Sequence, residues 1–246
     1  MMENKINFKV YGKFALFTDP LTRVGGEKCS YHLPTYEALK GVLSSVYWKP
    51  TFIWYIDKVR VMNRIKTQSK SIKPVNFAGI YPSKKSPDTM KEKSFHDLSI
   101  YSYLADVEYQ VEAHFEWNLK REDMKNDRID GKHFEVAKRM IERGGRRDIF
   151  LGTRECQAYV EPCKFGDGKS HFDESEEIAY GLMFHGFDYP DELGVNELHA
   201  RFWWSKMNNG YVEFPRPEKC EIRKKVKSMA ANPPKSIGLD EEGLIE

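Results

Sequence analysis

Hydrophobic and polar residues alternate along several segments of the chain, and this pattern predicts β-strands. The clearest segments are residues 5–11, 52–62 and 98–117. A period of two is typical of a strand with one buried face. In the third segment the alternation puts His114 on the face opposite Phe115.

Apolar residues at helical spacing predict two helices between these strands. The first begins at Pro34, since proline fits the first helical turn, and it stops before Pro50. The second covers about residues 132–143 and ends at two glycines, 144–145. A last strand follows over residues 149–160. The order strand, helix, strand, strand, helix, strand is that of the ferredoxin-like split βαβ fold.

The sequence after residue 164 predicts a second, small antiparallel sheet. Three short aromatic runs provide its strands: residues 179–187, 200–205 and 211–214. Asn209-Gly210 between the last two runs is a strong hairpin signal. The expected class is therefore α+β, with a ferredoxin-like (RRM-like, βαββαβ) domain at residues 1–164, a small three-stranded antiparallel β domain at 165–229 and a flexible tail at 230–246.

Composition excludes several classes of protein. The 246 residues are 40% hydrophobic and carry a net charge of +2, which argues against a chain disordered as a whole. No apolar run is long enough to span a membrane, and the first residues lack the apolar core of a signal peptide. The four cysteines form no CxxC pair and no zinc-ligand spacing. We therefore expect a cytoplasmic protein with reduced thiols, no membrane contact, and no metal or cofactor.

The small net charge hides a separation along the chain. Residues 58–93 contain ten Lys or Arg and two Asp or Glu, whereas residues 165–200 contain nine acidic residues and one Lys. A basic segment beside a near-neutral remainder indicates a polyanionic partner. The alternative interpretation is a solvated basic loop.

Common catalytic motifs are absent from the sequence, including the P-loop, H-E-x-x-H and G-x-S-x-G. Metal-free cleavage of RNA remains possible, because the ribose 2′-OH is a nucleophile that needs only an acid or base and a charge stabiliser. Two side chains suit this chemistry: Tyr47 at the end of the first helix, and His114 on the polar face of a strand. Each could also be purely structural, as a tyrosine at the edge of the core and a hydrogen-bonded histidine.

A glycine–arginine segment after the second helix is a candidate phosphate-binding element. Glycines let the backbone approach a phosphate, and arginines hold it with paired hydrogen bonds. The predicted RNA-binding residues are Arg143, Gly144, Gly145, Arg146, Arg147 and Arg154, with Lys66, Lys70 and Lys73 from the basic segment. Binding through such contacts is expected to depend steeply on salt.

Several short blocks resemble the subtype I-C members of the family-five CRISPR-associated proteins. The blocks are YG at 11–12, ALFTDPLT at 15–22, GGEK at 25–28, PTYEALKG at 34–41, YWKP at 47–50, GGRRDIFLG at 144–152 and FPRPE at 214–218. They keep their order along nearly the whole chain up to about residue 225.

This resemblance implies an endoribonuclease that works without a metal ion. Such a protein binds the repeat hairpin of precursor CRISPR RNA, cuts at its 3′ base and stays with the other subunits of the Cascade complex. The family's active site is implied to be a tyrosine, a histidine and a lysine close before that histidine. Tyr47 and His114 are assigned to the first two positions. Glu112 and Ala113 precede His114, so the lysine is missing there, and Lys49 or Lys120 would have to replace it.

Two alternatives remain open at this point. One is a non-catalytic Cascade subunit that caps the 5′ handle of the CRISPR RNA. The other is a general nucleic-acid binder or nuclease, with double-stranded DNA as a possible ligand of the basic segment.

Overall fold

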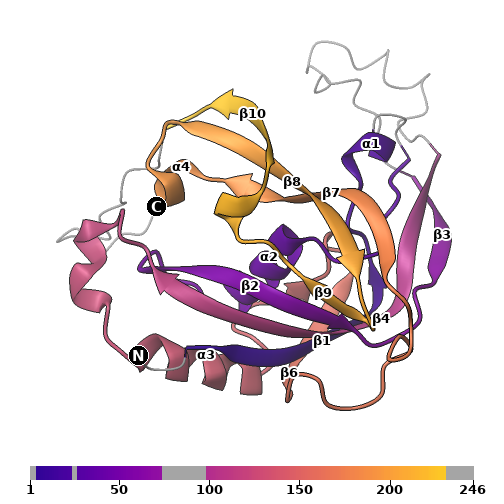
Figure 1. Ribbon diagram of the computed structural model, residues 1–246, viewed down its shortest axis with the longest axis horizontal. Helices are drawn as coiled ribbons and strands as arrows, with labels where there is room; N and C mark the ends of the chain where they lie inside the picture. Colours follow the sequence, from indigo (N-terminus) through magenta and orange to yellow (C-terminus); the bar gives the residue numbers. More distant parts are fainter. Residues whose placement is uncertain (1–3, 24–26, 74–97, 231–246) are drawn as a thin grey trace, which may run out of the picture.

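The structure is a computed structural model that describes residues 4–23, 27–73 and 98–230 (Figure 1). Its elements are, in chain order, β1 (Ile6–Ala15), α1 (Pro20–Arg23), α2 (Tyr36–Val46), β2 (Phe52–Val61), β3 (Thr67–Ile72), β4 (Ser99–Trp117), η1 (Glu122–Asp127), α3 (Lys132–Glu142), β5 (Ile149–Phe150), β6 (Gln157–Pro162), β7 (Ile178–Asp188), α4 (Pro190–Leu193), β8 (Glu197–Met207), β9 (Tyr211–Glu213), η2 (Pro217–Lys219) and β10 (Ile222–Ser228).

The main sheet has the ferredoxin-like strand order. Its strands run β5-β6-β1-β4-β2-β9, with β3 paired to the outer part of β4. The central four, β6-β1-β4-β2, are antiparallel neighbours, and they correspond to the order 4-1-3-2 of the split βαβ motif. The predicted α+β fold, with a ferredoxin-like unit and a second small sheet, is confirmed.

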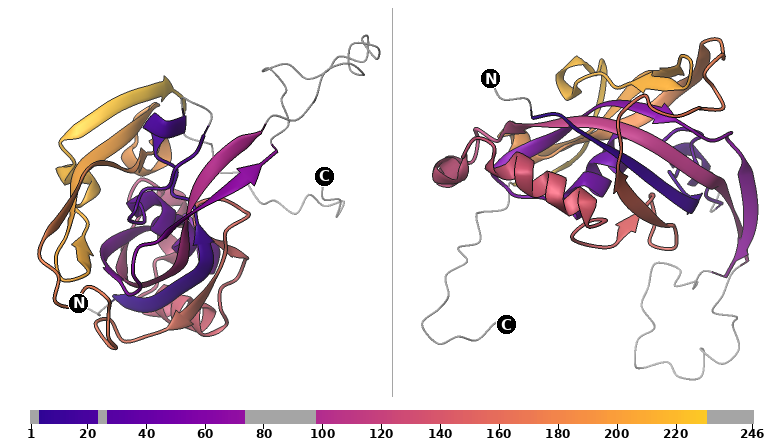
Figure 2. Two further views of the ribbon diagram at one scale, coloured as in Figure 1. Left: turned by 90° about the vertical axis from the view of Figure 1, so that its right-hand side faces the viewer. Right: turned by 90° about the horizontal axis from the view of Figure 1, so that it is seen from below.

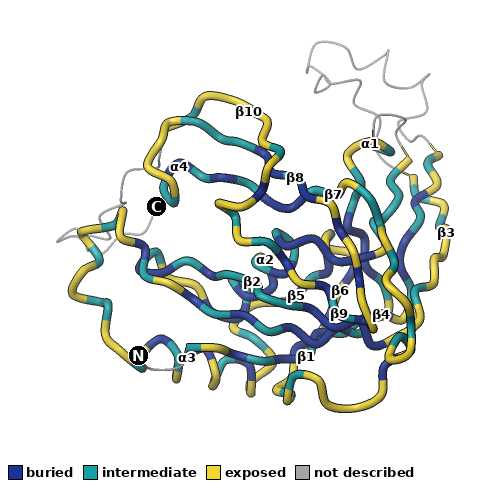
Figure 3. Tube along the Cα trace, viewed as in Figure 1, coloured by how far each residue is buried: buried dark blue, intermediate teal, exposed yellow. Residues whose placement is uncertain are grey.

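Both long helices cover the same face of this sheet (Figure 2). Thr35 caps the N-terminus of α2, where its side chain accepts a hydrogen bond from the Ala38 amide. The apolar stripe of α2 and the buried side of α3 pack on alternate residues of β1, β2 and β4. Figure 3 shows the buried backbone concentrated in this layer. Burial of this apolar face is the main favourable contribution to the fold.

The opposite face of the sheet is polar and contains many ion pairs. They join Lys5 to Glu112, Lys9 to Glu161, Lys58 to Glu213 and Arg216 to Glu116. Part of the acidic loop folds over this face, because Arg60 donates to the carbonyls of Asp167 and Gly168 and pairs with Asp173. Asp173 of the acidic segment thus forms a structural ion pair with Arg60.

The second sheet has three antiparallel strands in the order β10-β8-β7. The first two predicted strands belong to it, but the predicted third, residues 211–214, does not. That segment forms β9 and pairs with β2 in the main sheet. The third strand is β10, a basic, exposed edge strand, and lysines are typical of strand edges. The domain boundary at residue 165 stays a prediction. β9 follows that boundary in the chain but pairs with β2 of the main sheet.

Part of the basic segment forms a strand that the sequence pattern did not predict. β3 pairs with β4 from Thr67 to Ile72. Its residues are mostly polar and exposed, so the sequence shows no alternation of hydrophobic and polar positions there. Residues 74–93 of that segment lie outside the described residues, as does the predicted flexible tail apart from Ala230. Within the described part, no helix has the length and apolarity needed to cross a bilayer.

Two glycines give opposite predictions for stability. Gly152 has φ +94°, and a Cβ there would lie 2.0 Å from the Leu16 carbonyl oxygen, so Gly152→Ala is expected to lower the free energy of unfolding by more than about 2 kcal/mol. Gly41 lies inside α2 with open space around it, so Gly41→Ala is expected to raise the free energy of unfolding by about 0.5–1 kcal/mol. Urea unfolding of both variants tests this, and equal effects would contradict it.

Candidate active site

Tyr47 follows the last turn of α2 and points into the space between the two helices. Its backbone N–H donates to the Leu43 carbonyl, while φ −160° and ψ 127° end the helix there. The indole N–H of Trp54 donates to the Tyr47 carbonyl over 2.8 Å. These two backbone contacts fix the position of the phenol, which is 5% exposed.

The Tyr47 hydroxyl is hydrogen-bonded to Nδ1 of His133, in the first turn of α3, over 2.8 Å. The other ring nitrogen of His133, Nε2, lies 2.8 Å from the Asp127 carbonyl oxygen. A carbonyl oxygen can only accept, so Nε2 carries a proton, and Nδ1 of the neutral ring is an acceptor. Tyr47 therefore donates its hydroxyl proton to His133.

Aromatic rings enclose His133 on its other sides. Phe52 of β2 and Trp117 of β4 lie with ring centroids 5.2 and 5.7 Å from it. The His133 side chain has no exposed surface, whereas the Tyr47 ring keeps a small opening. Both residues are buried, and Tyr47 is the less buried of the two.

Lys132 precedes His133 and is the exposed cation of this cluster. Its ammonium group pairs with the Asp127 carboxylate, and 45% of its side chain is exposed. The hydrogen bond from Lys132 and then that from Thr51 hold the pKa of Asp127 below its usual range. Burial and the negative charge of Asp127 raise the pKa of Tyr47, so its phenol stays protonated at neutral pH.

His114 does not share a site with Tyr47. It lies on β4 between Ala113 and Phe115, which face the helices, so its own side chain faces the opposite, ion-paired side of the sheet. There its Nδ1 lies 2.8 Å from Asp57, and its ring stacks on Tyr55. The expectation that Tyr47 and His114 come together is wrong, because alternation along β4 puts the main sheet between them.

The glycine–arginine segment lies beside the end of α2, as a phosphate-binding role near Tyr47 requires. Gly144 and Gly145 have φ of +81° and +107° and close the C-terminus of α3. Arg146 and Arg147 are exposed and line a hollow together with Ser44, Ser45 and Trp48. Arg143 is exposed at the end of α3, and the Arg154 guanidinium lies 5.9 Å from the Phe150 ring centroid.

The three predicted lysines lie elsewhere. Lys70 belongs to β3 and pairs with Tyr101 near the start of β4, whereas Trp117 next to His133 is at the other end of that long strand. Lys66 pairs with Asp106, Lys70 lies 3.1 Å from the Phe14 ring centroid, and Lys73 is exposed. The structure therefore separates these lysines from Tyr47, and their contact with RNA stays a prediction.

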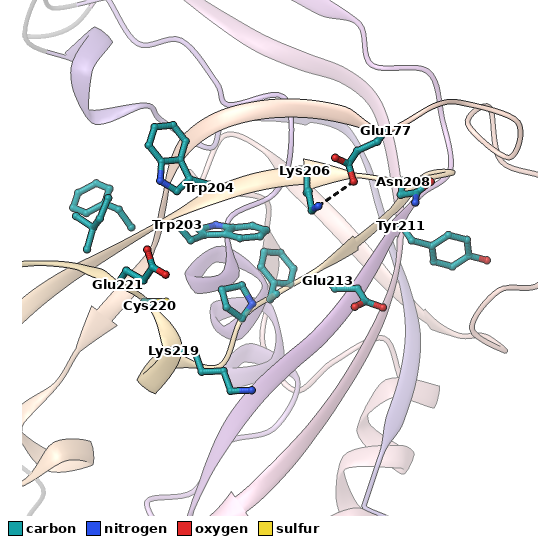
Figure 4. A pocket seen from close by; sticks show the side chains of 14 residues that line it. Glu177, Trp203, Trp204, Lys206, Asn208, Tyr211, Glu213, Lys219, Cys220 and Glu221 are labelled. Atoms are coloured by element: carbon teal, nitrogen blue, oxygen red, sulfur yellow. Dashed lines mark ion pairs between the residues drawn. The ribbon is translucent and has the colours of Figure 1, made fainter.

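A larger cavity of about 760 Å³ opens where β8 and β9 diverge (Figure 4). Aromatic side chains such as Trp203 and Trp204 line it together with acidic and basic residues. It contains none of the predicted site residues. In the part of the chain that the structure describes, no three His, Cys, Asp or Glu side chains group in a way that could hold a metal ion.

Comparison with known proteins identifies the family. The sequence model described as CRISPR-associated protein (Cas_Cas5), in its Cas5d form, matches residues 6–215. The chain belongs to the Cas5d family. The expected membership in subtype I-C is thereby confirmed.

Two curated relatives support this assignment, and each is named CRISPR pre-crRNA endoribonuclease Cas5d. The protein of Mannheimia succiniciproducens is 32% identical over 87% of this chain and 96% of its own length. That of Thermus thermophilus is 30% identical over 89% of this chain and 94% of its own.

Solved structures agree with the Cas5d assignment. A CRISPR-associated protein (33% identity) and a functionally uncharacterized protein of Streptococcus mutans (36% identity) both superpose with a TM-score of 0.70. In each case the match covers 89% of this chain and 96% of the other chain.

Sequence reasoning missed Lys132 and His133 in this Cas5d chain. A lysine directly before a histidine is present in the sequence, and it fits the expected tyrosine, lysine and histidine set better than His114. His133 lies at the start of a predicted helix, where its spacing does not distinguish it from an ordinary surface residue. Only the contact between the two helices shows that it meets Tyr47.

Removal of the hydrogen bond between Tyr47 and His133 is expected to destabilise the folded protein. Tyr47→Phe leaves Nδ1 of the buried His133 without a donor, which is expected to lower the free energy of unfolding by about 1–3 kcal/mol. Tyr159→Phe is the control, because Tyr159 is exposed. Chemical unfolding of both Cas5d variants measures the difference, and the same stability in both would show that the hydrogen bond contributes nothing.

His114 makes the stability of the protein pH-dependent. Its hydrogen bond with Asp57 raises its pKa above the usual value of 6.5, so protonated His114 stabilises the fold below pH 6.5. This contribution is lost as the pH rises through the raised pKa. His114→Gln is expected to flatten the fall in melting temperature above pH 6.5, and an unchanged pH profile would contradict the assigned pairing.

Proposed function

We propose that this Cas5d family member is an endoribonuclease that cuts precursor CRISPR RNA within its repeat. The observation that carries the proposal is the family match over residues 6–215, together with two full-length relatives named as pre-crRNA endoribonucleases. The cluster of Tyr47, Lys132 and His133 supports it, because these side chains supply the groups that metal-free RNA cleavage needs.

In the proposed reaction the ribose 2′-OH attacks the adjacent phosphorus, and the bond from phosphorus to the 5′ oxygen breaks. The proton of the 2′-OH passes to the Tyr47 oxygen while Tyr47 gives its own proton to Nδ1 of His133. The leaving 5′ oxygen takes up a proton from water. The products are a 2′,3′-cyclic phosphate and a 5′-hydroxyl end.

The surroundings of His133 favour this proton transfer. When His133 becomes an imidazolium, the Asp127 carbonyl accepts from Nε2, and the Asp127 carboxylate lies 3.4 Å from the same atom. A negative group beside a developing cation lowers the barrier. Tyr47 acts at the substrate and His133 acts through Tyr47, so His133 is a positioning and proton-accepting residue behind the reactive phenol.

Lys132 supplies the positive charge for the phosphorane-like transition state. Its ammonium group is exposed enough to reach a phosphate, unlike the buried His133. Lys132 takes the place left open by the lysine that is missing before His114, so neither Lys49 nor Lys120 is needed for this role.

We further infer that the cut RNA and the other subunits of a type I-C Cascade complex are the partners of this chain, since this follows from the Cas5d family's place in that system. The predicted binding of double-stranded DNA stays a prediction. Of the basic segment that motivated it, residues 74–93 lie outside the described residues.

The direct test is incubation of the purified protein with its own repeat RNA in EDTA. We expect cleavage at one position, a 5′-hydroxyl product that a kinase labels directly, and no cleavage when the nucleotide at the cut carries a 2′-deoxy group. Cleavage of that deoxy substrate would exclude the 2′-OH mechanism. A protein that binds the repeat and leaves it intact would instead support the role of a non-catalytic subunit.

Substitutions distinguish the role of His133 in cleavage from that of His114. Tyr47→Phe and His133→Gln are each expected to slow single-turnover cleavage by about 10²–10⁴-fold, the usual contribution of a proton-transfer group. Lys132→Gln is expected to cost about 10²–10³-fold through lost charge stabilisation. His114→Gln is the matched histidine control and should cut like the wild type. If His114→Gln loses activity while His133→Gln keeps it, the site assigned here is wrong.

A further inference from the structure

A hollow of about 150 Å³ lies beside Tyr47 and is not used by the chemistry described above. Ser44 and Ser45 of α2, Trp48, Arg146 and Arg147 line it. Trp48 directly follows Tyr47 in the chain, and the positive charge of Arg146 opposes the rise in the pKa of Tyr47. The hollow therefore lies at the end of α2 that Tyr47 follows, and its occupant would be held near that end of the helix.

The backbone builds this hollow. After α3, the Gly144 and Gly145 amides donate to the carbonyls of Ile141 and Met140, and the Arg147 amide then donates to Ser45 of α2 over 3.1 Å. At Gly145, φ is +107°, and a Cβ would lie 3.2 Å from the Arg147 carbonyl oxygen, so glycine suits this close turn. The turn holds both arginines against the end of α2.

The charges around the hollow favour an anion. None of its five lining residues is acidic. Within the described residues, neither Arg146 nor Arg147 takes part in an ion pair, whereas Arg216 and Arg121 are each paired with a carboxylate. Guanidinium groups that are free of carboxylates can bind phosphate with paired hydrogen bonds.

The other side of the hollow suits a nucleobase. The indole of Trp48 is 52% exposed, and an exposed aromatic face beside bound phosphate is the usual platform on which bases of single-stranded nucleic acid stack. The Ser44 and Ser45 hydroxyls donate to the carbonyls of Lys40 and Gly41. Their oxygens therefore remain acceptors for the N–H groups on a base edge.

From these features, and resting on the proposed function, we infer that the hollow binds one nucleotide of single-stranded RNA next to the scissile phosphate. Its base stacks on Trp48, and its phosphate is bound by Arg146 and Arg147. A cavity of about 150 Å³ admits one six-membered aromatic ring, which is the size of a pyrimidine base. Trp48 is thus a substrate-positioning residue that places the ribose against Tyr47.

The test combines variants of Trp48 with RNA that lacks one base. The probe is the repeat RNA with a 2′-deoxy block at the cut, so that binding is measured without cleavage. Trp48→Ala is expected to weaken binding about 5- to 100-fold, as expected for loss of one base–aromatic stack, whereas Trp48→Phe keeps most of the affinity. Trp204→Ala is the matched control, because Trp204 is 67% exposed and lines the separate cavity of Figure 4.

An abasic nucleotide placed on either side of the cut identifies the base. At one of these two positions, the abasic RNA should bind the wild type as weakly as intact RNA binds Trp48→Ala, and it should weaken Trp48→Ala little further. The proposed subsite is rejected if the loss of affinity from the abasic nucleotide and that from Trp48→Ala multiply at both positions. It is also rejected if Trp48→Ala binds the RNA like the wild type. Thermal unfolding of Trp48→Ala checks that the variant is folded, and Trp48→Phe provides the comparison if it is not.

The salt dependence of RNA binding tests the phosphate contacts separately. Arg147→Gln is expected to reduce the dependence of log Kd on log salt by about 0.7, the value for one contact with a single strand. An unchanged slope would remove Arg147 from the subsite. Failure of the wild type to cut repeat RNA in EDTA would overturn the proposed function, whereas wild-type cleavage with no effect of Trp48→Ala would overturn this inference alone.

Discussion

The proposed active site depends on one hydrogen bond, from the Tyr47 hydroxyl to His133 Nδ1. It joins the end of α2 to the start of α3, two helices that are separated in the chain by three strands of the main sheet, β2, β3 and β4. Because His133 is fully buried, its ring nitrogens need partners, and the Asp127 carbonyl fixes the second one. The same contacts that satisfy the buried imidazole also fix its tautomer, which leaves it ready to accept a proton.

The ferredoxin-like order brings these helix ends together. With β1 and β4 at the centre, the βα units on either side place α2 and α3 on one face of the sheet. Trp117 at the end of β4 and Phe52 at the start of β2 face each other in register and both pack near His133. The ring environment of the site is therefore made by the strand ends, and the reactive groups are supplied by the helices.

The sequence predicted the elements that carry a strong period and missed those without one. β1, β2, β4, α2 and α3 each bury one face, so their spacing is visible in the residues. β3 and β10 are polar, exposed strands whose pairing comes from their neighbours. Tyr47 could be named from the sequence. Alternation along β4 puts His114 on the polar face, opposite Phe115, which already argues against a contact with a helix. The adjacent Lys132 and His133 were the available signal for the partner, but only the packing of α2 against α3 shows that His133 meets Tyr47.

Lys132 is held in a way that leaves it available to RNA. Its pairing with Asp127 is partly exposed to water, and exposed ion pairs contribute little stability. A phosphate can therefore take this ammonium group at small cost, while Thr51 still donates to the Asp127 carboxylate over 2.7 Å. When Lys132 turns to the phosphate, Asp127 keeps its negative charge beside His133. In the proposed reaction the Asp127 carboxylate then stabilises the imidazolium that forms as Tyr47 passes its proton to His133, so Asp127 serves both the resting site and the reacting site.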